Sequence, residues 1–197
     1  MTGDPTIRDQ VIVQIETGFA RTTRPSAPFI VGSREGCEPG ESVEPFLHLT
    51  DWRGIDPAVL DVHYTALSFF SEAGFRFFLP AYLVADVRDQ LSTADPSFHL
   101  THGFHATTVS TPARVVTTGG PALINPQRYG AITWDETARF RLSVFTREEA
   151  VAIVAYLTWR RDTDTLGVSR AAIDSALERF WLERTRSAPS ADALGGF

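Results

Sequence analysis

Apolar residues recur at helical spacing in four long stretches of the chain. Ile7, Val11, Ile15 and Phe19 follow each other at intervals of four, which places them on one stripe of a helix over 5–20. Further stretches with intervals of three and four predict helices over 72–90, 147–161 and 170–185. These helices are expected to bury Phe19, Phe75, Phe78, Tyr82, Val154, Leu157 and Phe180.

Polar residues and prolines mark where some helices begin. Asp56 and Pro57 place an N-cap carboxylate before a proline at the first helical position, which predicts a short helix from there. Thr146 and Glu149 have the spacing of a capping box and predict the start of the helix over 147–161.

Pro80 lies inside the pattern that predicts the helix over 72–90. A proline there has no N–H to donate to the carbonyl of Arg76, so we expect a kink or a break at this point. Arg76 is expected to pair with a carboxylate one turn earlier, such as Glu72.

Residues 92–137 show no sustained period and contain four prolines. They predict a long irregular segment with at most a small β-sheet or hairpin near 108–145. Within that range the run "ARFRLSVF" alternates, with Phe140, Leu142 and Val144 on one face, and predicts a strand. An acidic loop is expected at "SREGCEPGESVEP", which combines glycine, proline and regularly spaced glutamates.

The predicted fold is therefore mainly α, with α+β as the alternative. We expect a single compact helical domain over 1–186 and a disordered tail over 187–197, which is small and polar. A chain of 197 residues, 43% of them hydrophobic, is long enough to bury one substantial core.

Composition excludes several classes of function. The net charge of −6 argues against binding to the nucleic-acid backbone, and no apolar run approaches the length of about 20 residues that spans a membrane. All 18 basic residues are arginine, so Schiff-base chemistry on a lysine and a P-loop are excluded. Cys37 is the only cysteine, which favours a reducing, cytoplasmic location.

The run "FHLTHGFHA" contains His99, His102 and His105 at intervals of three. Metal ligands on one helix are usually four apart, and ligands on one strand are two apart, so this spacing fits neither arrangement. A loop could still bring the three together with Asp95 as a fourth ligand. The favoured interpretation is a polar loop whose histidines make ordinary hydrogen bonds.

Other catalytic and cofactor-binding signatures are absent from the sequence. No G-x-S-x-G or G-x-G-x-x-G motif occurs, and Cys37 lies in an acidic stretch that would raise its thiol pKa. We therefore expect no cofactor.

Aromatic residues are densest in "ALSFFSEAGFRFFLPAYL". Most of them have the spacing of a buried helix face, but Phe77 lies off the face formed by Phe75 and Phe78. Phe77 therefore needs a second packing surface, which either another helix or a partner provides.

The segment "DWRGIDPAVLDVHYTALSFFSEAGFRFFLPAYLVADVRD" resembles the core of a small bacterial family of unknown function. Members share a tryptophan, a step similar to "ALSFL", a helix similar to "FRYYLPAYL" with its internal proline, and a later helix similar to "FTREEAVAIVAYLTW". This sequence has Glu149 where the family tends to have glutamine. The resemblance covers about half of the chain and implies no activity. The histidine run lies outside the resemblance. The positions that match the family's pattern are Trp52, Leu67, Ser68, Phe69, Phe70, Phe75, Arg76, Leu79, Pro80, Ala81, Tyr82, Leu83 and Phe145.

Two hypotheses about function follow. The first is a non-catalytic binding protein, for example a regulatory or immunity-type partner in a bacterial cell, which binds another protein through Trp52, Phe77 and Arg76. The alternative is a metal-dependent hydrolase built on His99 and the two histidines that follow it. Metal content of the purified protein discriminates between the two hypotheses. The sequence does not identify the partner, any substrate or the oligomeric state.

Overall fold

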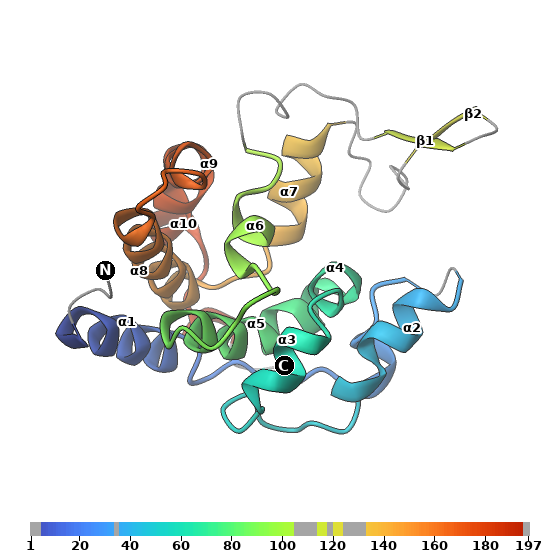
Figure 1. Ribbon diagram of the computed structural model, residues 1–197, viewed down its shortest axis with the longest axis horizontal. Coiled ribbons are helices and arrows are strands. Elements are labelled where there is room, and N and C mark those ends of the chain that lie inside the picture. Colours follow the sequence, from blue (N-terminus) through green and yellow to red (C-terminus); the bar gives the residue numbers. More distant parts are fainter. Residues whose placement is uncertain (1–4, 34–35, 105–113, 118–119, 124–132, 195–197) are drawn as a thin grey trace.

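The structure is a computed structural model that describes residues 5–33, 36–104, 114–117, 120–123 and 133–194. It is mainly helical, as predicted (Figure 1). The small amount of β-structure is the antiparallel hairpin of β1 (Arg114–Thr117) and β2 (Gly120–Leu123), which lies in the predicted region. Among the described residues no helix combines the length and the apolar character that a membrane span requires.

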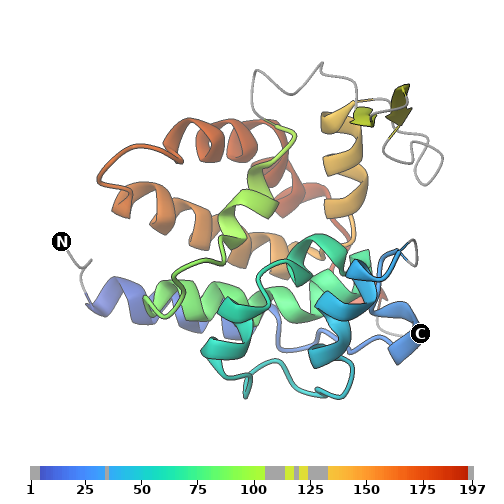
Figure 2. The same cartoon turned by 45° about the vertical axis from the view of Figure 1, so that its right-hand side comes forward.

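The long helices pack around α5 (Glu72–Val87). α1 (Pro5–Gly18) contacts both α5 and α8 (Arg147–Thr163), and Figure 2 shows α1 and α5 lying side by side. α8 also packs against the C-terminal helices, which follow one another as α9 (Arg170–Ala176), the π-helical turn η4 (Leu177–Trp181) and α10 (Leu182–Ser187).

α5 is the central element of the core because it is apolar on nearly every side. Buried residues surround its axis, from Gly74 to Val87. Phe78 is fully buried, and its ring centroid lies 4.9 Å from the ring centroids of both Phe70 and Phe77. A helix with this pattern must be covered all round, and the other helices do so.

Short elements form a second group. They are α2 (Glu38–Val43), η2 (Glu44–Phe46), α3 (Pro57–Val62) and α4 (Ala66–Phe69), and Figure 1 shows α2, α3 and α4 on one side of the molecule. α3 and Phe46 of η2 pack on α5, and α2 packs on α4. α2 corrects the expectation of a loop in the acidic segment. Its buried residues Pro39 and Val43 are four apart, the spacing of one helix face.

The region predicted as a strand at "ARFRLSVF" is also helical, in α7 (Trp134–Leu142). Thr133 and Glu136 form a capping box that starts this helix, and Asp135 pairs with Arg139 one turn later. Phe140, expected on the buried face of a strand, is 51% exposed. The strand prediction was wrong because a short alternating run is also compatible with a helix. Here the capping box that precedes the run starts a helix.

Pro80 does not end α5, which continues to Val87. The predicted pair between Arg76 and Glu72 is also replaced by a longer-range one. Arg76 Nε lies 2.9 Å from Glu149 Oε1 and 2.8 Å from Glu149 Oε2, so it links α5 to the first turn of α8. The expected pairing was local because sequence spacing alone cannot show a contact between helices.

The tail over 187–197 is not disordered along its whole length. Ala188 is buried, and α11 (Ala191–Leu194) follows. The backbone N–H of Ala191 donates to Glu148 at 2.8 Å, and the backbone N–H of Arg147 donates to the carbonyl of Pro189. The start of α8 therefore anchors this segment, although its composition is small and polar.

Most of the predicted core positions are buried. Phe19, Phe75, Phe78, Tyr82, Leu157 and Phe180 are at most 3% exposed, whereas Val154 is only partly buried. Ile7, at the start of the predicted stripe on α1, is 50% exposed because α1 extends beyond the helices that cover its other end.

Candidate functional site

All three residues predicted to contact a partner are buried or half-buried in the domain. Phe77 is 3% exposed and packs against Phe78, so the chain itself supplies the second surface that this ring needs. Arg76 is held by the carboxylate of Glu149, whose side chain is 2% exposed. Contact with a partner through either residue stays a prediction, but their visible contacts are with the chain's own core.

Trp52 also has a buried ring, and it forms part of the wall of a cleft of about 110 Å³. α5 contributes Ala81, Val84 and Ala85 to the same cleft, and Arg88, the residue that follows the helix, also lines it. The end of α5 shapes one rim, because Asp89 has a φ of 60° and turns the chain so that Gln90 also lines the cleft. Short polar residues such as aspartate tolerate this left-handed conformation.

Polar groups gather around Trp52. Its indole Nε1 is buried and has no hydrogen-bond partner within the described part of the chain. The guanidinium carbon of Arg53 lies 4.4 Å from the centroid of the Trp52 ring, and its Nη1 is 3.4 Å from Asp51. A buried donor without a partner is rare in folded proteins, which marks this cleft as a candidate binding site.

The histidine run does not form the loop that was expected. His99 lies in the last turn of α6 (Pro96–Thr101), which begins at the N-cap Asp95. His102 is the C-cap residue of the same helix, and His105 lies outside the described residues. Asp95 is therefore occupied as a helix cap, accepting from the backbone N–H of Phe98.

α6 and α7 together form a row of aromatic rings, which we call the aromatic row: Phe98, His102 and Trp134. The ring centroid of His102 lies 4.9 Å from that of Phe98 and 5.0 Å from that of Trp134. Phe98 is 52% exposed, so the row reaches the surface. Offset and edge-on contacts at these distances are favourable for aromatic rings.

Gly103 brings the two helices close enough to form the aromatic row. A Cβ at this position would lie 2.6 Å from the carbonyl oxygen of Trp134 and 2.7 Å from Cβ of Ala138. Gly103 also has a φ of 99°, a conformation that other residues rarely adopt. The glycine therefore permits both the turn after α6 and the close approach of α7.

Both described histidines of the run favour the uncharged form. Burial, and then the positive charge of Arg141, lower the pKa of His99 to about 3. The same two causes lower the pKa of His102. The Arg141 guanidinium lies over the ring of Phe75 at 4.6 Å from its centroid. At neutral pH the aromatic row is therefore uncharged and lies near a fixed positive charge.

No group of three histidine, cysteine, aspartate or glutamate side chains that could hold a metal ion occurs among the described residues. The hypothesis of a three-histidine site needs His105, which lies outside them. It stays a prediction.

A cluster of polar side chains, formed by Asp86, Tyr156 and Arg160, lies between α5 and α8. The hydroxyl of the fully buried Tyr156 donates to Asp86 Oδ2 at 2.6 Å, and Arg160 Nε is 3.7 Å from the same oxygen. Burial raises the pKa of Asp86. Because a substrate cannot reach Tyr156, this group has the character of a structural link between helices rather than of a catalytic site.

Sequence reasoning missed the aromatic row. His102 and Trp134 are separated by a segment without any period, so no local pattern brings α6 beside α7. The available signal was the capping box of Thr133 and Glu136, which would have predicted α7 and placed Trp134 at its first position.

Comparison with curated proteins and with solved structures found no match. A family model described as a family of unknown function (DUF6714) matches residues 7–185. The expectation of a family of unknown function is thus confirmed, and the match spans the aromatic row and continues into α10. The protein therefore belongs to the family of unknown function DUF6714.

Proposed function

We propose that this protein is a non-catalytic interaction protein that binds another protein through the aromatic row of Phe98, His102 and Trp134. The observation that carries the proposal is the 52% exposure of Phe98, whose ring is otherwise packed against its neighbours in the row. An exposed aromatic ring on a rigid, ring-lined support is typical of the residues that dominate the energy of protein interfaces.

The chemistry of the row indicates what the partner presents. Uncharged rings favour an apolar side chain, because burying it against them removes apolar surface from water. The proposed partner is therefore a protein with an exposed apolar residue.

Gly103 supports the proposal because it fixes the geometry of the row. The close approach of α6 and α7 leaves the backbone little freedom there. A preformed surface loses less conformational entropy on binding than a mobile one. The role in the cell is proposed to be regulatory or immunity-type, in the bacterial cytoplasm, where the exposed thiol of Cys37 would stay reduced.

The experiment that tests this function is site-specific photo-crosslinking in the native host. A benzophenone amino acid replaces Phe98 in one variant and Phe29 in the matched control, since Phe29 is also exposed, at 67%, but lies outside the row. We expect a discrete adduct of one additional protein at position 98 and its loss when His102 is also changed to alanine. The same adducts at both positions, or none at 98, would contradict the proposal.

A further inference from the structure

The cleft beside Trp52 combines a buried indole with two arginine side chains, Arg53 and Arg88, that line it. The Trp52 side chain is 3% exposed, and its Nε1 has no acceptor anywhere in the described ranges of the chain. Trp159 Nε1 is also buried without a partner, but Trp159 does not line this cleft and no arginine is shown stacked on its ring.

The charges around the cleft favour an anion. Arg53, stacked over the Trp52 ring, and the exposed Arg88 both line it, against the single carboxylate of Glu16. Gln90 contributes an amide on the same rim. Within the described residues Asp51 engages only one guanidinium nitrogen of Arg53, Nη1 at 3.4 Å, which leaves the other guanidinium donors for a ligand.

Size and polarity narrow the class of anion. The space of about 110 Å³ is smaller than a cavity of about 150 Å³ that holds benzene, so the ligand has only a few heavy atoms or is the end of a larger molecule. Ala81, Val84 and Ala85 form an apolar wall that suits a short hydrocarbon stem. Glu16 repels a second negative charge, which disfavours phosphate relative to a carboxylate.

We infer that this cleft is a binding site for a small monocarboxylate with a short apolar stem. The carboxylate pairs with Arg88 and with the guanidinium of Arg53, which lies over the face of the Trp52 indole. The stem packs on the alanine-rich wall of α5. This site is separate from the aromatic row and does not depend on the proposed protein partner.

The test is an NMR titration of the full-length protein labelled with ¹⁵N in its tryptophan side chains, with sodium propionate at constant ionic strength. The Trp52→Phe variant identifies the signal of Trp52, and the signal of Trp159 serves as an internal control. We expect a saturable shift of the Trp52 signal alone, with a roughly millimolar dissociation constant for so small a ligand. Propionamide and phosphate should both bind at least about fivefold more weakly than propionate, a difference on the scale of one exposed charge pair.

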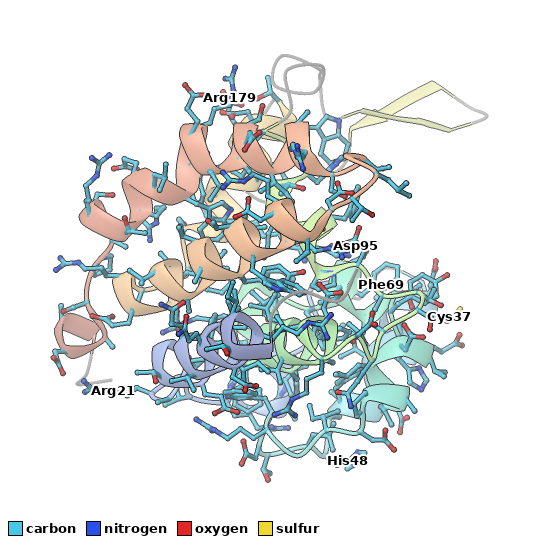
Figure 3. All side chains as sticks on the ribbon, turned by 60° about the vertical axis from the view of Figure 1, so that its left-hand side comes forward. Arg21, Cys37, His48, Phe69, Asp95 and Arg179 are labelled. Carbon is cyan, nitrogen blue, oxygen red and sulfur yellow. The ribbon has the colours of Figure 1, made fainter. Side chains whose placement is uncertain are left out.

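Arg88→Gln and Arg179→Gln form a matched pair of variants, because both arginines are exposed and neither side chain has a hydrogen bond or ion pair within the described residues. Figure 3 shows Arg179 at the opposite end of the molecule from His48, which precedes Trp52 in the chain. Arg88→Gln should weaken propionate binding about fivefold, and Arg179→Gln should leave it unchanged. Absence of a saturable shift, equal binding of propionamide, tighter binding of phosphate, or equal effects of the two variants would each overturn the inference.

Discussion

Glu149 joins three segments of the chain through one carboxylate. It accepts hydrogen bonds from Arg76 on α5, from the hydroxyl of Thr22 after α1, and from the backbone N–H of Thr146 at the start of α8. A buried carboxylate with this many donors is well compensated for its loss of water. Its capping role was predictable from the sequence, whereas its pairing with Arg76 depends on how α5 and α8 pack.

Replacing Glu149 with alanine should lower the free energy of unfolding by about 3 kcal/mol, because Arg76 would lose its buried partner. The value is at the lower end for such changes since Arg76 keeps 22% of its side chain exposed. Glu41→Ala, at an exposed position of α2, is the control and should change stability little. Urea denaturation measures both, and equal midpoints for the two variants would contradict this account.

His99 should make the protein sensitive to acid. Its pKa is lowered to about 3 in the folded protein, so the unfolded chain binds the proton more readily. The contribution of His99 to stability is therefore complete above its unfolded pKa of about 6.5 and is lost as the pH falls from there toward 3.

The change His99→Gln removes this titration. Thermal unfolding between pH 7 and pH 4 should show a smaller loss of Tm in His99→Gln than in the original protein. His48→Gln, which changes an exposed histidine, should keep the original pH profile (Figure 3). Identical profiles for His99→Gln and the original protein would show that His99 is not buried in its neutral form.

At the scale of elements, the sequence predicts best where a long apolar period carries the signal. α1, α5 and α8 begin where expected, because each presents an apolar face and two of them have a side-chain cap. α2 and α7 were missed, since both are short or polar and their helical state depends on one buried face against the core. Where an apolar period is this short, turn residues or an alternating run can outweigh it, and the helix is predicted as a loop or a strand.

Gly103 is the position where the contact between α6 and α7 can be tested. Gly103→Ala and Gly167→Ala both place a side chain at a positive φ, of 99° and 69°, so they share the backbone strain. Only Gly103→Ala also forces Cβ against α7, and it should therefore cost about 1–3 kcal/mol more in unfolding free energy. Equal losses of stability in the two variants would mean that α7 does not lie against Gly103.

At the scale of the whole molecule, several charged side chains are paired within the fold. Arg161 pairs with Asp162 and Asp174, and Arg139 pairs with Asp135. Exposed glutamates of α2 remain at one side of the molecule, as Figure 1 shows for the position of that helix. The aromatic row, by contrast, is uncharged and is assembled only by the tertiary structure.

The most direct test of the proposed function is the affinity of the purified protein for the partner that crosslinks at position 98. Isothermal titration calorimetry compares the original protein with Phe98→Ala and with Phe29→Ala, two exposed phenylalanines of which only the first belongs to the aromatic row. The account predicts at least about tenfold weaker binding for Phe98→Ala, as expected for a central aromatic contact, and unchanged binding for Phe29→Ala. Unchanged affinity in Phe98→Ala, or equal weakening in both variants, would contradict it.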